Sequence, residues 1–325
     1  MIKRSLLSLL AVVLMSPAVA PVAFADTAYP SRPIRIVLGF PAGSATDIIT
    51  RIYAEEIGKN LNGTVVVENQ PGAASNIASA AVARSEPDGY TLLMATTANA
   101  TSVNLYKSLR YDFRKDFEPI ALLASAPPVI SVNAGSSIQS VQDLIKLAKA
   151  KPGEVTFGSS GVGTAPHMSA ELLNMMAGIK MTHVPYKGTN DAITDLVTGR
   201  LMVLFSPLPT VSSLAGDKKI RILAVTTKQR STLAPDLPTV AESGVPDFDA
   251  TLWFGLVAPK GTPPAVLAKL SAAVEKAAQS TGLKERLRSS GGEPMLVSGN
   301  AFGTFIDSNI ETWAKVISFA GLERR

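Results

Sequence analysis

The residues with the clearest chemical capacity follow a strand-like run at 34–38, in the loop 39–47. Ser44 and Asp47 form the S-x-x-D pattern that caps a helix, and apolar residues at helical spacing come after them. This pattern predicts a helix that begins where a strand ends. Because the first N–H groups of a helix have no partner within it, the loop could receive an anion.

Two later segments repeat the order of strand, loop and helix start. A strand at 65–68 precedes the loop 69–76, and a strand at 155–157 precedes the glycine-rich loop 158–164. One such loop is typical of any strand-to-helix turn. Several loops that converge would instead form a pocket.

Residues suited to catalysis or metal binding are sparse. The chain has two histidines, His167 and His183, and no cysteine, which excludes disulfides, thiol nucleophiles and thiolate metal sites. The run 158–163 matches neither the nucleophile elbow G-x-S-x-G nor a phosphate loop, and no metal-binding spacing is present. A structural role is favoured for each histidine, and we expect no metal and no cofactor.

Backbone N–H groups, hydroxyls, amides and the basic side chain of Lys187 are the remaining candidates for ligand contacts. Charge-assisted hydrogen bonds contribute roughly 1.5–3 kcal/mol each. Several converging donors could therefore hold a carboxylate without an arginine clamp. This set of groups indicates binding rather than chemical conversion.

The elements that would position these groups alternate between strands and helices. The first series is 34–38, 47–57, 65–68, 76–84 and 90–94, beginning with a strand. The second places strands at 129–132, 155–157, 181–185, 201–205 and 220–225, with helices at 141–150, 166–176 and 191–198. A strand at 252–257 and helices at 264–279, 283–288 and 301–319 complete the chain.

Such alternation predicts an α/β fold with mainly parallel sheets covered by helices. Ligands bind beyond the carboxyl ends of the strands in such sheets. The predicted rim comprises the loops 39–47, 70–76 and 95–100.

Residues 1–25 have the pattern of a secretory signal peptide. Lys3 and Arg4 precede an apolar stretch, and the small-x-small ending 23–25 supplies a cleavage site. No later run approaches the ~20 apolar residues of a membrane-spanning helix, so we expect a soluble, exported protein of the periplasm. Basic residues are scattered rather than grouped with aromatic ones, which indicates no nucleic-acid partner.

Eight segments together resemble the Bug family of extracytoplasmic solute receptors, the binding components of tripartite tricarboxylate transporters. They are YPSRPI at 29–34, AGSATD at 42–47, VENQPGA at 67–73, PDGYTLL at 87–93, DFEPI at 116–120, GSSGVGT at 158–164, VPYKG at 184–188 and LPTVAE at 237–242. Each is common alone. The set in this order, over nearly the whole chain, is specific.

The resemblance implies a two-lobed periplasmic-binding-protein fold of type II, a Venus flytrap that closes on its ligand. Lobe 1 would comprise 26–127 and 251–325, and lobe 2 would comprise 128–250. A small carboxylated ligand would lie between the loops 39–47 and 158–164 and pass to integral membrane transporter subunits. We expect a monomeric receptor without enzymatic activity.

The candidate ligand contacts lie on these loops or beside them. They are Phe40, Ala42, Gly43, Ser44, Thr46, Asp47, Asn76, Thr97, Ser159, Ser160, Gly163, Thr164, His167, Tyr186, Lys187 and Ser206. Phe40 and Tyr186, with Trp253 as a weaker candidate, could wall the cleft. In that case an aromatic acid fits as well as an aliphatic di- or tricarboxylate.

Two positions depart from the pattern of many relatives. Ser44 replaces a second glycine, and Ser206 replaces an acidic residue after Phe205. A buried ammonium group needs a counter-charge, so the missing acidic side chain favours a ligand without an ammonium.

Two other functions stay open at this point. The closed receptor could signal to a membrane partner instead of feeding a transporter. An exported serine hydrolase could use Ser159 or Ser160 with His167, although the elbow motif is absent.

Overall fold

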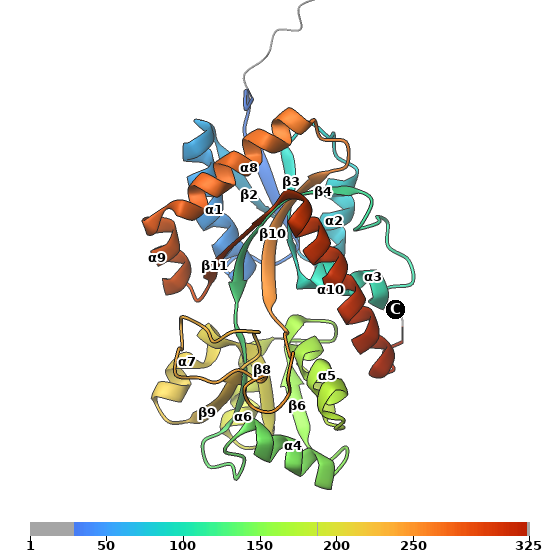
Figure 1. Cartoon of the computed structure of the whole chain (residues 1–325), viewed down its shortest axis with the longest axis vertical. Coiled ribbons are helices and arrows are strands. Elements are labelled where there is room, and N and C mark those ends of the chain that lie inside the picture. The colour runs from blue at the N-terminus through green and yellow to red at the C-terminus, as the bar shows by residue number, and fades with distance from the viewer. Residues whose placement is uncertain (1–28, 187, 324–325) are drawn as a thin grey trace, which may run out of the picture.

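The computed structural model describes residues 29–186 and 188–323. The predicted signal peptide, 1–25, and Lys187 lie outside the described residues. Figure 1 shows two lobes, each built on one sheet with helices against it. We call the lobe with the six-stranded sheet lobe 1 and the lobe with the five-stranded sheet lobe 2. The predicted two-lobed α/β fold is confirmed.

The elements of lobe 1 come from both ends of the chain. Its strands are β1 (Ile34–Leu38), β2 (Val65–Asn69), β3 (Thr91–Thr96), β4 (Phe117–Ala126), β10 (Leu252–Pro259) and β11 (Glu293–Ser298). Its helices are α1 (Ala45–Leu61), η1 (Ala73–Ser75), α2 (Asn76–Ala83), α3 (Thr97–Leu105), α8 (Pro264–Gln279), α9 (Thr281–Ser289) and α10 (Gly299–Phe319).

The elements of lobe 2 come from the middle of the chain. Its strands are β5 (Pro128–Asn133), β6 (Thr156–Ser159), β7 (Thr182–Pro185), β8 (Val203–Pro207) and β9 (Ile220–Val225). Its helices are α4 (Val141–Ala150), α5 (Ala165–Ala177), α6 (Thr189–Val197) and α7 (Leu208–Gly216).

Both sheets are mixed, which corrects the prediction of mainly parallel sheets. In lobe 1 the order is β11-β4-β10-β3-β1-β2, with β1 parallel to β2 and β3 but β10 antiparallel to β3 and β4. In lobe 2 the order is β7-β6-β8-β5-β9, and β5 is antiparallel to both neighbours. The cause is the path of the chain, because β4 leads out of lobe 1 while β10 returns beside it.

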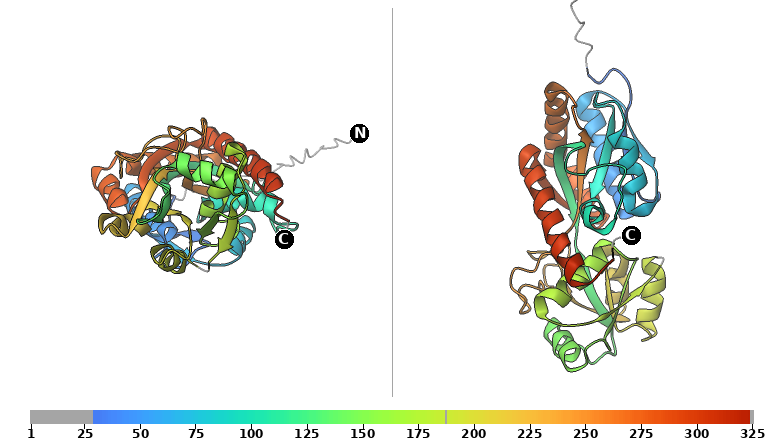
Figure 2. Two further views of the ribbon diagram at one scale, coloured as in Figure 1. Left: turned by 90° about the horizontal axis from the view of Figure 1, so that it is seen from below. Right: turned by 90° about the vertical axis from the view of Figure 1, so that its right-hand side faces the viewer.

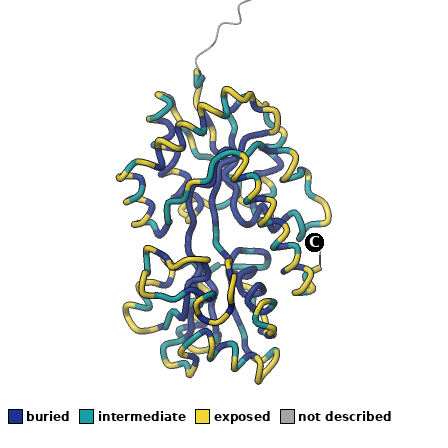
Figure 3. Tube along the Cα trace, viewed as in Figure 1, coloured by how far each residue is buried: buried dark blue, intermediate teal, exposed yellow. Residues whose placement is uncertain are grey.

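Three segments join the lobes. β4 continues into β5 through Pro127, and residues 226–251 lead back to β10. The strands at this waist are mostly buried (Figure 3). The third segment is α10, which reaches down from lobe 1 and packs against α5 (Figures 1 and 2). The lobe boundaries at residues 127 and 250 stay a prediction.

One apolar cluster extends through both lobes. It includes Val37 and Leu122 of lobe 1, Trp313 of α10, and Phe157 and Phe205 of lobe 2. Full burial of such a side chain contributes roughly 1.5–3 kcal/mol. The core therefore fixes the strand ends from which the loops of the site extend.

Candidate functional site

A cavity of about 160 Å³ lies between the two lobes. Lobe 1 contributes Phe40, Ala45, Thr46, Ala74, Thr96, Ala98, Leu252 and Phe254, and lobe 2 contributes Ser160, Gly163, Thr164, Ala165, Pro166, Thr189 and Pro207. None of these lining residues has a charged side chain. Hydroxyl groups and backbone amides are therefore the polar groups that the lining offers to a ligand.

Five helices begin at this cavity. Its lining includes the first residues of α1, α5 and α6 and the residues that precede α3 and α7. The N-terminus of each helix carries roughly half a positive charge, because its first N–H groups lack partners within the helix. The predicted convergence of loops at one rim thus forms a cavity with a positive potential, which suits an anion.

The loop before α1 is organised by Asp47, which is 3% exposed. Its carboxylate accepts hydrogen bonds from the N–H of Gly43 at 2.9 Å, from Asn69 Nδ2 at 2.9 Å and from Arg51 Nε at 3.0 Å. Burial raises the pKa of Asp47, but these hydrogen bonds outweigh burial and hold the pKa below its ordinary value. Ser44 Oγ accepts from the N–H of Asp47 at 3.2 Å, which confirms the predicted cap.

The loop after β6 is held by both histidines. Ser159 Oγ lies 2.7 Å from His183 Nε2, and His167 Nδ1 accepts from the N–H of Gly163 at 3.1 Å. Ser159 is fully buried and does not line the cavity. A nucleophilic serine needs access to its substrate and a hydrogen bond to its base. The pairing of Ser159 with His167 that a hydrolase would use is therefore not formed.

Five of the predicted contacts line the cavity, namely Phe40, Thr46, Ser160, Gly163 and Thr164. They come from both lobes, as a site between lobes requires.

The other candidates on the loop before α1 do not line the cavity. Ala42 and Gly43 are exposed, and Ser44 and Asp47 use their side chains to stabilise the start of α1. Lys187 lies outside the described residues.

The remaining polar candidates also lie away from the lining. Asn76 Oδ1 accepts from the hydroxyl of Tyr111 at 2.6 Å, and Thr97 Oγ1 accepts from the N–H of Trp253 at 3.3 Å. Ser206 is buried, and its hydroxyl has no hydrogen-bond partner among the described residues.

Two aromatic side chains that were expected to wall the cleft make other contacts instead. The hydroxyl of Tyr186 donates to Asp195 at 2.9 Å, and burial together with this carboxylate raises the pKa of Tyr186 to about 12. Trp253 is fully buried against Phe302 and Phe305. Neither ring lines the cavity.

Several lining residues were not named from the sequence, among them Thr96, Ala98, Thr189, Pro207 and Phe254. The predicted rim segment 95–100 contained the first two. Thr189 begins α6 just beyond β7, and Pro207 ends β8, so the same rule about strand ends could have found them.

The chain is similar to proteins that are already known. A family described as "Tripartite tricarboxylate transporter family receptor" matches residues 49–322. The chain belongs to this receptor family. It is 33% identical over 318 residues to the protein BugT of Bordetella pertussis, with 97% of each chain covered.

Solved structures of similar proteins agree with this assignment. The receptor is similar to the R. palustris protein Rpa4515 with adipate, at a TM-score of 0.79 and 35% identity, covering 90% of this chain and 98% of that one. It is also similar to MatC of Rhodopseudomonas palustris with bound malate, at a TM-score of 0.75 and 28% identity, covering 89% and 100%. The resemblance to the Bug family is confirmed, and the chain is a solute receptor rather than an enzyme.

Backbone strain borders the receptor's cavity at Ala74. Ala73, Ala74 and Ser75 have φ angles of 46°, 52° and 74°, in the left-handed region that favours glycine. We expect Ala74→Gly to raise the free energy of unfolding by about 0.5–1 kcal/mol, because the strain that it relieves exceeds the added entropy of the unfolded chain.

Differential scanning calorimetry measures this effect. Ala81→Gly is the control, since Ala81 lies inside α2 and glycine lowers stability inside a helix. A lower melting temperature for Ala74→Gly would contradict the assignment of strain.

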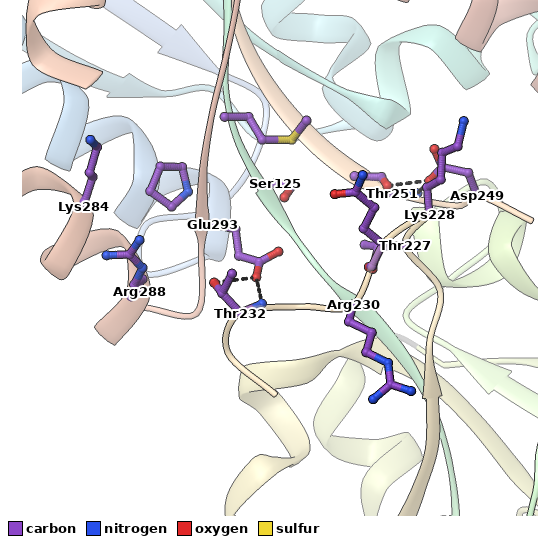
Figure 4. A pocket seen from close by; sticks show the side chains of 13 residues that line it. Ser125, Thr227, Lys228, Arg230, Thr232, Asp249, Thr251, Lys284, Arg288 and Glu293 are labelled. Carbon is purple, nitrogen blue, oxygen red and sulfur yellow. Dashed lines mark hydrogen bonds between the residues drawn. The ribbon is translucent and has the colours of Figure 1, made fainter. Parts of the chain in front are cut away.

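A separate groove of about 590 Å³ lies beside the strands that join the lobes (Figure 4). Glu293 of β11 accepts hydrogen bonds from the N–H and the hydroxyl of Thr232, which follows β9, so this contact links the lobes. Asp249 accepts from the hydroxyl of Thr251 at 2.6 Å. Four basic side chains line the same groove, namely Lys228, Arg230, Lys284 and Arg288. The groove thus differs from the cavity between the lobes, whose lining has no charged side chain.

Two further findings apply to residues 29–186 and 188–323. No helix there has the length and apolar character to cross a bilayer. No group of three or more histidine or acidic side chains there is arranged to hold a metal ion.

Proposed function

We propose that this receptor works in the periplasm, binds one small aliphatic dicarboxylate between its lobes, and delivers it as a monomer to the membrane subunits of a tripartite tricarboxylate transporter. The observation that carries the proposal is the convergence of five helix N-termini on a cavity without charged side chains. Such a cavity attracts negative charge and contains no carboxylate that would repel it.

The start of α5 is the proposed seat of one carboxylate group. Thr164, the N-cap residue, forms no side-chain cap hydrogen bond, and its hydroxyl donates to the carbonyl of Gly161 at 2.7 Å. Ser160 brings a second hydroxyl to the same wall. A partly buried helix end contributes up to about 2 kcal/mol to anion binding, and each charge-assisted hydrogen bond adds roughly 1.5–3 kcal/mol. Phe40 and Thr46 would face the ligand from lobe 1.

The size of the cavity favours a compact acid, and the ligands of two relatives favour an aliphatic one. Its volume of about 160 Å³ is close to the roughly 150 Å³ of an engineered cavity that takes benzene, so a compact molecule fits. Tyr186 and Trp253 lie away from the cavity, whereas Phe40 and Phe254 line it, so the walls alone do not separate an aliphatic acid from an aromatic one. The relatives with adipate and with malate support the same class.

A thermal-shift panel tests the proposal on residues 26–325. It contains adipate, malate, benzoate, glutamate and the neutral diamide of adipate. Ligand at about 100 times its dissociation constant adds roughly 2.7 kcal/mol of stability, which for a chain of this size is a rise of about 5–10 °C. We expect adipate or malate to give such a rise and the diamide to give none.

Other outcomes would overturn parts of the proposal. A panel without any shift would contradict carboxylate binding. The largest shift with benzoate or with glutamate would contradict the aliphatic class or the exclusion of an ammonium group.

A further inference from the structure

The loops before α1 and α5 have the same local structure, one in each lobe. Their sequences are GSATD at 43–47 and GTAPH at 163–167. Gly43 and Gly163 have φ angles of 79° and 81°, and the N-cap residues Ser44 and Thr164 have φ angles of −69° and −72°. In each loop the side chain of the third helical residue accepts a hydrogen bond from the N–H of the glycine. Matched helix starts thus face the cavity from both lobes.

The two loops differ in the charge of that third residue. In α1 it is Asp47, and Arg51 one turn later lies 2.9 Å from its carboxylate. In α5 it is His167, and Glu171 occupies the position one turn later. The start of α1 therefore holds a carboxylate that an arginine balances. At the equivalent place α5 holds an imidazole, and Glu171 occupies the position that Arg51 has in α1.

The ring of His167 fills this place without charge. Its Nδ1 accepts from the N–H of Gly163, so Nδ1 carries no proton and the ring is neutral. The ring is 1% exposed and stacks with His183 and with Phe157, at centroid distances of 4.0 and 6.1 Å. Its Nε2 lies 3.7 Å from the carboxyl group of Glu171. Burial lowers the pKa of His183 to about 4, so at neutral pH this second ring adds no charge either.

We propose that His167 is a positioning residue for anion binding, because it closes the α5 loop with a neutral acceptor where a carboxylate would repel the bound acid. The inference rests on the proposed function. His167 does not line the cavity; it is a positioning residue that acts through Gly163 and the start of α5 on Ser160 and Thr164. A carboxylate in its place would have Glu171 beside it instead of a balancing arginine.

The test compares His167→Asn with His167→Asp. Both variants lose the imidazole, and both place an oxygen where Asp47 reaches the N–H of Gly43 in the matched loop, so both can close the loop. They differ in charge. Titration calorimetry at pH 8 with adipate and with malate measures affinity, and circular dichroism with thermal unfolding checks folding. We expect the Asp variant to bind about 10- to 30-fold more weakly than the Asn variant.

Each outcome decides the inference. Equal affinities of two folded variants, with a wild-type protein that binds, would overturn it and leave the proposed function intact. A wild-type protein that binds neither acid would overturn the proposed function and the inference with it. If the Asp variant does not fold, the Asn variant decides. An affinity within about threefold of wild type supports the inference, and a larger loss overturns it, because a neutral acceptor would then not be enough.

Discussion

Replacing Asp47 with alanine should lower the free energy of unfolding by roughly 2–4 kcal/mol and weaken ligand binding about tenfold. The N–H of Gly43, the amide of Asn69 and the guanidinium of Arg51 would all lose their acceptor. Arg51 is half exposed, so water replaces part of its interaction and keeps the loss below that of a fully buried pair. Chemical denaturation and titration calorimetry measure the two effects.

Asp143→Ala is the matched control. Asp143 has the same pattern at the start of α4, where its N–H donates to Ser140 Oγ and its carboxylate accepts from the N–H of Gln139. It lies away from the cavity, so we expect a smaller loss of stability and an unchanged affinity. Equal effects of the two substitutions would contradict the special role of Asp47.

Asp47 also makes stability depend on pH. Its pKa is lower in the folded chain than in the unfolded chain. Its contribution is therefore fully present above about pH 3.9, the ordinary value, and is lost as the pH falls through the lower folded value. Asp47→Asn should flatten this part of the curve of unfolding free energy against pH.

Gly163→Ala should weaken ligand binding by about 10- to 100-fold. A Cβ atom at Gly163 would lie 2.6 Å from Leu105 Cδ2, and Leu105 belongs to α3 of lobe 1. The added methyl group would thus press the lobe 2 loop against the Leu105 side chain of lobe 1. The φ of 81° adds about 1–2 kcal/mol of backbone strain, which lowers stability as well.

Gly178→Ala separates strain from contact. Gly178 ends α5 with a φ of 60° and has open space around its added Cβ. We expect a similar loss of stability from strain and no change in affinity. A Gly163→Ala protein that binds its acid as tightly as wild type would contradict this prediction, because the loop could then move away from α3 without a loss of affinity.

Local patterns in the sequence predicted the positions of the main loops. The cap at Ser44 and Asp47, the helix at 141–150 and the strand at 220–225 all follow from short-range spacing, and the structure confirms them. The helix α3 was not predicted, because its Thr- and Asn-rich sequence has weak helix propensity. Thr96 and Asn99 form a capping box that starts it, and its residues are mostly buried.

The sequence could not predict which side chains contact one another in the fold. Three residues have side chains suited to a cleft, namely Tyr186, Thr97 and Trp253. Each of them instead contacts a residue that only the tertiary structure brings near. The two histidines were predicted to have structural roles, and their contacts with the 158–164 loop depend on β7 lying beside β6. The direction of the strands in lobe 1 also depends on β4 and β11, which pair antiparallel to their neighbours. The residue spacing in the sequence did not predict these two strands.

A crystal structure of residues 26–325 with the acid that stabilises the protein most is the most direct measurement of the central claim. We predict one acid molecule between the lobes, with a carboxylate group at the start of α5 beside Ser160 and Thr164 and with Phe40 and Thr46 on its other side. An acid molecule in the groove beside Glu293, with the cavity between the lobes empty, would contradict the account.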